Sequence, residues 1–84
     1  MNHQKPAKES SWIETIGFED GVIEIHCKNG KVMRYQSGSP EVPVLTEADH
    51  EAFLEAESPG RFYNAKLKGI YQGGTVNPDA EEMR

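Results

Sequence analysis

Three histidines and one cysteine are the side chains of this chain best suited to hold a metal ion. His26 and Cys27 are neighbours on an expected strand, so their side chains point to opposite faces and cannot chelate one ion together. His3 lies in a polar end of the chain, and His50 lies on an expected helix. Neither a Cys-x-x-Cys nor a His-Glu-x-x-His pattern occurs. The sequence therefore predicts no metal site and no cofactor.

Nucleophiles and paired acids give no indication of an enzyme. Cys27 falls on the expected buried face of its strand, where a thiol behaves as a small hydrophobic group, whereas an activated cysteine needs exposure and a positive neighbour. Glu55 and Glu57 are two residues apart on an expected helix, so they do not face each other. Gly73 and Gly74 follow the last expected helix and cannot hold a phosphate at a helix N-terminus. We expect no catalytic activity and no small-molecule substrate.

Basic and aromatic side chains that could contact RNA are few. Nine Lys and Arg residues against fourteen Asp and Glu give a formal net charge of -5, and phosphate neutralisation normally supplies most of the affinity of a nucleic-acid binder. Trp12 or Tyr71 could stack on a base, although packing at the domain edge also accounts for both rings. The candidate nucleic-acid-binding residues are Arg34, Arg61, Lys66, Lys68 and Tyr71.

Acidic side chains form a more regular pattern. Glu47, Glu51 and Glu55 recur every four residues, so on a helix they make one stripe. A solvated helix face accounts for such a stripe, and so does a surface that binds a partner protein. Two functions therefore stay open: a nucleic-acid-binding module, and a protein-interaction or regulatory module. The sequence names no partner.

The length and composition bound the class of protein. Eighty-four residues make one small domain with a thin core. No apolar run approaches the ~20 residues that a membrane helix needs, and the first residues lack the apolar segment of a secretory signal. A single cysteine cannot form an internal disulfide. By elimination we expect a cytoplasmic protein that does not contact a membrane.

Two turn signals define the elements that carry these side chains. Asp20-Gly21 and Asn29-Gly30 each separate runs rich in β-branched residues, which is the strongest short-range indication of a hairpin. A two-residue loop at the first signal pairs Phe18 with Ile23, and both then lie on one face of the sheet. The expected strands span residues 12–19, 22–28 and 31–36.

The second hairpin has two registers to choose from. A two-residue loop places Arg34 opposite Ile25, whereas a three-residue loop over 28–30 places Met33 there and sets Arg34 opposite Glu24 on the outer face. Register follows the hydrophobic pattern where one face is buried, so we expect the three-residue loop with a glycine bulge and an exposed Glu24–Arg34 pair. The buried face then holds Ile16, Phe18, Ile23, Ile25, Cys27, Met33 and Tyr35.

Two short helices are expected after a linker over residues 36–44. Thr46 is typical of an N-cap, and the first helix should span 47–57. Ser58 and Pro59 start the second helix, because serine caps and proline fits the first helical position. The predicted fold class is α+β, a three-stranded antiparallel meander followed by two short helices packed on one sheet face. We expect a disordered segment at 1–10, a domain at 11–71 and a flexible tail at 72–84.

The start of the second helix resembles a known family. Ala56, Ser58, Gly60, Phe62, Tyr63 and Asn64 read as the A-x-S-x-G-x-[FY]-[FY]-N segment of the KTSC domain. That family is named for the C-terminus of some lysyl-tRNA synthetases and also occurs as short stand-alone proteins of bacteria and their phages. The resemblance covers about residues 12–71 and implies a β-meander before the motif. From the synthetase context it implies that the nucleic acid bound is RNA. Under the alternative function, the family's occurrence implies a bacterial or phage protein that acts on a host protein. The family-motif residues are Tyr35, Ser58, Gly60, Phe62 and Asn64.

The chain departs from the family pattern in two places. The family carries Tyr-x-Tyr in its third strand, and residues 33–35 keep only the second tyrosine. Residues 37–44 look like an insertion before the first helix. Within the motif, we expect the Asn64 side chain to hydrogen-bond backbone near the Ser58 turn. The alternative is a polar recognition residue beside Arg61.

Overall fold

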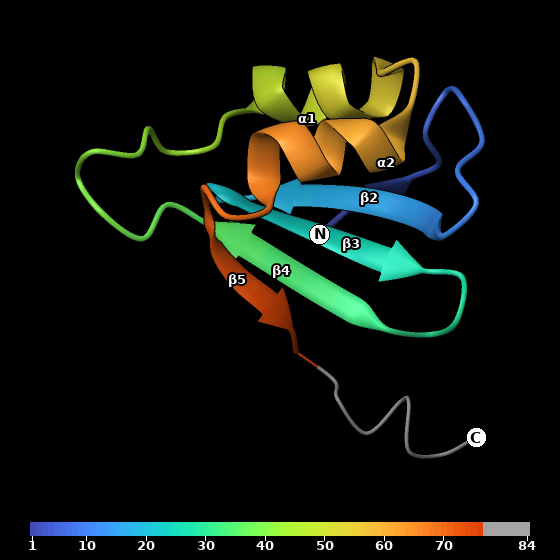
Figure 1. Cartoon of the computed structure of the whole chain (residues 1–84), viewed down its shortest axis with the longest axis horizontal. Helices are drawn as coiled ribbons and strands as arrows, with labels where there is room; N and C mark the ends of the chain where they lie inside the picture. Colours follow the sequence, from blue (N-terminus) through green and yellow to red (C-terminus); the bar gives the residue numbers. More distant parts are fainter. Residues whose placement is uncertain (77–84) are drawn as a thin grey trace.

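The computed structural model describes residues 1–76 and shows a five-stranded antiparallel sheet with helical segments on one face (Figure 1). The strands lie in the order β1-β2-β3-β4-β5, so each strand pairs with the next along the chain. The strands are β1 (His3–Gln4), β2 (Ile13–Glu19), β3 (Val22–Cys27), β4 (Val32–Gln36) and β5 (Gln72–Thr75). The helical segments are α1 (Glu47–Glu55), α2 (Pro59–Phe62) and a π-helical turn, η1 (Tyr63–Leu67).

The α+β class is confirmed, but the prediction of three strands is wrong. The additional strands β1 and β5 come from the two ends of the chain, which were expected to be disordered or flexible. At the first end, the Ala7 N–H donates to the Leu54 carbonyl at 2.7 Å, and Ser10 is buried. At the other end, a Cβ on Gly73 would lie 1.9 Å from the Arg34 carbonyl oxygen, so glycine lets β5 lie close to β4. The rest of the predicted tail, 77–84, lies outside the described residues.

Both predicted hairpin registers are confirmed. Phe18 pairs with Ile23 across the first turn. Across the second turn, Met33 pairs with Ile25, as the three-residue loop requires. Gly30 has a φ of 93°, a left-handed conformation that glycine adopts at little cost. The hydrophobic alternation therefore selected the correct register.

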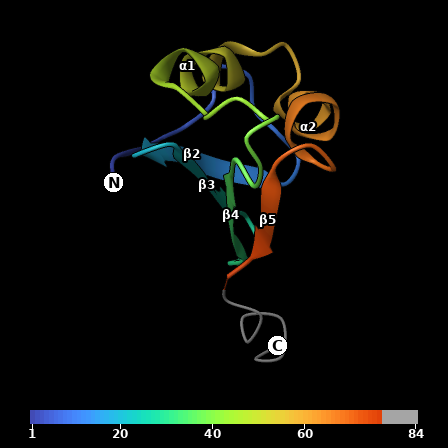
Figure 2. The same ribbon diagram turned by 90° about the vertical axis from the view of Figure 1, so that its left-hand side faces the viewer.

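Figure 2 shows the helical segments over one face of the sheet, and the core side chains pack between these two layers. The isoleucines of β2 and β3 that face this layer are fully buried, and so are Phe53 of α1 and Leu67 of η1. Phe62 stacks on Phe53 with ring centroids 5.0 Å apart, which joins the two helices. The buried cluster comprises Ile13, Ile16, Ile23, Ile25, Met33, Tyr35, Leu45, Phe53, Leu54 and Leu67.

The first helix starts where the sequence predicts. Thr46 and Asp49 form a capping box: the Thr46 N–H donates to the Asp49 carboxylate at 2.8 Å, and the Asp49 N–H donates to Thr46 Oγ1 at 3.4 Å. The helix ends at Glu55, two residues earlier than expected. No helix within residues 1–76 is long and apolar enough to cross a membrane.

The second helix also starts as predicted but ends as a π-helical turn. Ser58 is the N-cap, and its hydroxyl accepts from the Arg61 N–H at 3.3 Å. After Phe62 the backbone widens, so that the Lys68 N–H donates to the Tyr63 carbonyl at 2.9 Å. The helical path stops before Gly69, whose φ is 79°.

Candidate functional site

The outer face of the sheet carries a polar cluster centred on Glu24. Its chain neighbours Ile23 and Ile25 fill the core, so Glu24 points away from the helices. It lies opposite Arg34, as predicted. The prediction that this pair is exposed is wrong for Glu24, which is only 6% exposed, because the β1 residue His3 lies against its carboxylate.

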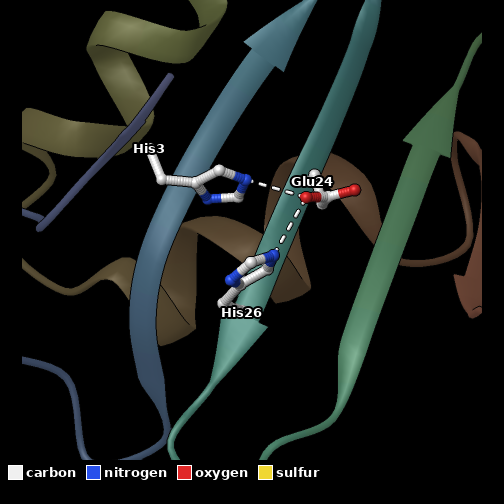
Figure 3. Close-up of side chains that lie close together, drawn as sticks. All are labelled: His3, Glu24 and His26. Carbon is white, nitrogen blue, oxygen red and sulfur yellow. Dashed lines mark hydrogen bonds and ion pairs between the residues drawn. The ribbon is translucent and has the colours of Figure 1, made fainter. Parts of the chain in front are cut away.

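Two histidines share one oxygen of the Glu24 carboxylate (Figure 3). The Nε2 atoms of His3 and His26 lie 2.7 and 2.9 Å from Glu24 Oε1, and their rings are 4.0 Å apart. The guanidinium Nε of Arg34 donates to the other oxygen, Oε2. On the far side of the His3 ring, Nδ1 lies 3.2 Å from Thr15 Oγ1. Glu24 therefore connects three strands through one carboxylate.

The surroundings keep Glu24 ionised. Burial alone would raise its pKa, but hydrogen bonds from Arg34, His3 and His26, together with the charge of Arg34, outweigh burial and lower the pKa to about 2. An ionised carboxylate can only accept hydrogen bonds. Both imidazoles therefore donate through Nε2–H, and in the neutral form of His3 the Nδ1 atom accepts from the Thr15 hydroxyl.

A glycine in β2 makes room for the His3 ring. Gly17 pairs with His3, and a Cβ on Gly17 would lie 2.8 Å from His3 Nε2. Sequence reasoning missed this cluster because it assigned His3 to a disordered end. A glycine inside a strand often marks the close approach of another group, so Gly17 was one indication in the sequence.

The predicted acidic stripe lies on the exposed face of α1. Glu47, Glu51 and Glu55 are exposed and form no ion pair within residues 1–76. Glu47 and Glu51 also line a pocket of about 330 Å³ between α1 and the sheet edge at β1 and β2. We call this the α1 pocket; its lining comprises Asn2, Gln4, Phe18, Glu19, Glu47, His50, Glu51 and Leu54.

Two apolar side chains, Phe18 and Leu54, line the more buried part of the α1 pocket. Phe18 stacks on His50 with ring centroids 5.9 Å apart, and Leu54 is buried. His50 Nε2 donates to the Ile16 carbonyl at 3.2 Å, which ties this wall of the pocket to β2. The pocket thus combines an apolar floor with carboxylates at its rim.

The predicted nucleic-acid-binding residues do not form one patch. Arg34 lies on the outer face of the sheet and pairs with Glu24, whereas Arg61 lies on α2, in the layer that covers the opposite face. Lys66 and Tyr71 are brought together, because both line a second pocket, of about 250 Å³, which Asp49 also lines. Lys68 is exposed just after η1.

Tyr71 is half-buried against the core rather than freely exposed. Its pKa is raised by burial and by the nearby charge of Asp49. Trp12 is also half-buried, with its ring edge against Tyr63 at a centroid distance of 5.2 Å. Both rings therefore pack at the domain edge.

Most family-motif residues serve the fold. Gly60 leaves space for Trp12, whose Nε1 would lie 3.0 Å from a Cβ at that position. The Tyr35 hydroxyl hydrogen-bonds the Tyr63 hydroxyl, and burial together with this bond raises the pKa of Tyr35. Asn64 is exposed, and its side chain forms no hydrogen bond within residues 1–76, so the expected link to the Ser58 turn is not observed.

The fold and the motif together define a small α+β domain in which a β-meander precedes two short helices. The KTSC domain family matches residues 9–71, and the chain belongs to this family, as the motif predicts. An uncharacterized protein of Stutzerimonas stutzeri (strain A1501) is 31% identical over 67 residues, which cover 77% of this chain and 84% of that protein.

Proposed function

We propose that this chain is a non-enzymatic protein-interaction module that binds a basic segment of a partner protein through the α1 pocket. The observation that carries the proposal is the pairing of an apolar floor, Phe18 and Leu54, with the carboxylates of Glu47 and Glu51 at the rim. No cation within residues 1–76 forms an ion pair with these two carboxylates.

The chemistry of the α1 pocket suits a lysine or arginine side chain. Such side chains bury an aliphatic stem along apolar surface while the charged end stays in water. The stem would lie on Phe18, and the charged end would reach Glu47 or Glu51. Exposed ion pairs contribute only about 0–1 kcal/mol each, so the apolar contact must supply much of the affinity. The net charge of -5 would speed the encounter with a basic partner.

A charge-matched capture experiment tests this proposal. The full chain is immobilised and exposed to a nuclease-treated bacterial lysate, beside Glu47→Lys/Glu51→Lys and a control, Glu14→Lys/Glu57→Lys. Each reversal adds two positive charges, so both double variants carry a formal net charge of -1. Glu14 and Glu57 are exposed and lie outside the α1 pocket.

We expect the wild type and the control to retain one protein through a basic segment, and the Glu47→Lys/Glu51→Lys variant to lose it. If both double variants lost the partner equally, net charge alone would account for the loss, and the proposal would be overturned. Retention in all three would show that binding uses another surface.

RNA association is the second candidate, favoured by the shared pocket of Lys66 and Tyr71. One lysine beside a half-buried ring, with Asp49 in the same pocket, offers few phosphate contacts. Two such contacts give a salt slope of about -2 and little nonspecific affinity. Fluorescence anisotropy with labelled RNA at several salt concentrations measures both the affinity for RNA and its dependence on salt. Micromolar binding that weakens in Arg61→Ala or Lys66→Ala would place RNA above a protein partner.

Location in the cytoplasm belongs to the same proposal. The single cysteine, Cys27, cannot form an internal disulfide and is half-buried. Burial raises the pKa of its thiol, so little of it is the reactive thiolate. A chain without disulfides suits a reducing compartment.

A further inference from the structure

We propose that His3, Glu24 and His26 form a binding site for a divalent transition-metal ion, with Zn²⁺ as the representative ligand. One ligand atom from each residue lies within 4.8 Å of the other two. The three side chains converge on one point of the sheet's outer face (Figure 3). This face is opposite the helices, so the inference does not depend on the function proposed for the α1 pocket.

The donor set fits such an ion. Two imidazole nitrogens and one carboxylate oxygen, with water in the fourth position, form a known type of open zinc site. Softer thiolate ligands are absent from the cluster, and two imidazoles favour a transition metal over Mg²⁺ or Ca²⁺. His26 has 42% of its side chain exposed, so solvent reaches the site.

Metal binding replaces the two hydrogen bonds between the imidazoles and Glu24 and keeps the contact between His3 and Thr15. Each neutral imidazole moves its proton from Nε2 to Nδ1, so that the Nε2 lone pair can bind the ion, and this step releases no proton. The Nδ1–H of His3 then donates to Thr15 Oγ1, now 3.2 Å away. Metal-bound histidines usually make such a bond through the other ring nitrogen.

The geometry needs only a small adjustment. Zinc bonds of about 2.0–2.1 Å in a tetrahedral site place neighbouring donor atoms about 3.3 Å apart. The two nitrogens now lie 2.7 and 2.9 Å from Glu24 Oε1. Spreading each pair by about half an ångström lies within the rotation of two imidazoles about their side-chain torsions, because neither ring is fully buried.

Arg34 sets the mode and the strength of binding. Its guanidinium holds Glu24 Oε2, which leaves Oε1 as the single carboxylate ligand. Its positive charge opposes the ion. With three protein ligands and this charge, we expect an affinity in roughly the micromolar range, weaker than that of four-ligand structural zinc sites.

Calorimetric titration of the full chain with ZnCl₂ tests the site. The variants are His3→Gln, Glu24→Gln and His26→Gln, and the control is Cys27→Ser, because Cys27 is the other zinc-binding side chain next to His26 but lies toward the core. We expect one ion per chain, affinity reduced at least about tenfold by each of the three variants, and no change in the control.

A second readout uses the unmodified chain. In ¹⁵N-labelled protein, two-bond correlation spectra report which ring nitrogen carries the proton. We expect zinc to fix both His3 and His26 with the proton on Nδ1 and to leave His50 unchanged. This readout stays informative if a variant fails to fold.

Three results would overturn the site. They are the absence of binding at millimolar zinc, binding that survives Glu24→Gln and His26→Gln but needs His3, and binding lost only in Cys27→Ser. The second result would assign the ion to the first residues of the chain alone.

Discussion

Lowering the pH should remove a stabilisation that the fold draws from the Glu24 carboxylate. The pKa of Glu24 falls from its ordinary value of 4.5 to about 2 in the folded chain. Linkage converts this difference into about 3 kcal/mol of folding free energy, because one pKa unit corresponds to about 1.4 kcal/mol. The groups that face the carboxylate are Arg34 from β4, His3 from β1 and His26 from β3.

The sign follows from the lowered pKa. The folded chain binds a proton at Glu24 less readily than the unfolded chain does, so the stabilisation is complete above about pH 4.5. It is lost as the pH falls toward 2. Trp12, the single tryptophan, packs against Tyr63, so its fluorescence reports unfolding. Urea denaturation at a series of pH values, followed by this fluorescence, gives the free energy of unfolding.

The matched variant is Glu24→Gln, which keeps the shape of the side chain but has no carboxyl group to ionise. We expect the wild type to be more stable than the variant by about 3 kcal/mol at neutral pH, and the difference to shrink to near zero close to pH 2. If the free energy of unfolding changed with pH in the same way for both proteins, or if both were equally stable at neutral pH, the view that three partners hold Glu24 ionised would be refuted.

Further predictions concern the core, the His3 contact and the tyrosine pair. Ile25→Ala should lower the free energy of unfolding by about 2–5 kcal/mol in urea denaturation, because Ile25 is fully buried; a loss below about 0.5 kcal/mol, typical of surface sites, would contradict its core position. Gly17→Ala should cost about 1–3 kcal/mol in the wild type, because the new methyl group meets the His3 ring. In a His3→Ala background the same change should cost much less, and equal costs in this double-mutant cycle would argue against the contact. Tyr35→Phe should cost about 1 kcal/mol through loss of the hydrogen bond to Tyr63, and an unchanged urea midpoint would contradict that bond.

The central part of the fold could be predicted because short-range rules control it. Asp20-Gly21 and Asn29-Gly30 fix the turns, and the alternation of Ile23, Ile25 and their partners fixes the register. The helix starts at Thr46 and Ser58 follow from capping chemistry, which depends only on nearby residues.

The edges of the sheet could not be predicted in the same way. β1 and β5 have almost no apolar side chains to alternate, so neither shows the period of a strand. Their backbones pair because β2 and β4 present open edges, which is a tertiary effect. The π-helical turn after Phe62 likewise has no local signal in the sequence.

The polar cluster was missed for the same reason. His3 reaches Glu24 only once β1 has joined the sheet, and their separation of 21 positions along the chain conceals the contact. His26 points away from its neighbour Cys27, and its partner is Glu24, two residues away on the same face of the strand. By contrast, the acidic stripe of α1 was predicted, because it depends on helix periodicity alone.

The most direct test of the proposed function maps the bound surface. The partner captured from nuclease-treated lysate is added to ¹⁵N-labelled chain, and backbone amide shifts are followed by NMR. We expect the largest shifts at the α1 pocket, on Phe18 of β2 and on His50 and Glu51 of α1, and little change at Lys66 and Tyr71. Shifts concentrated at Lys66 and Tyr71, with the α1 pocket unchanged, would contradict a partner site on α1.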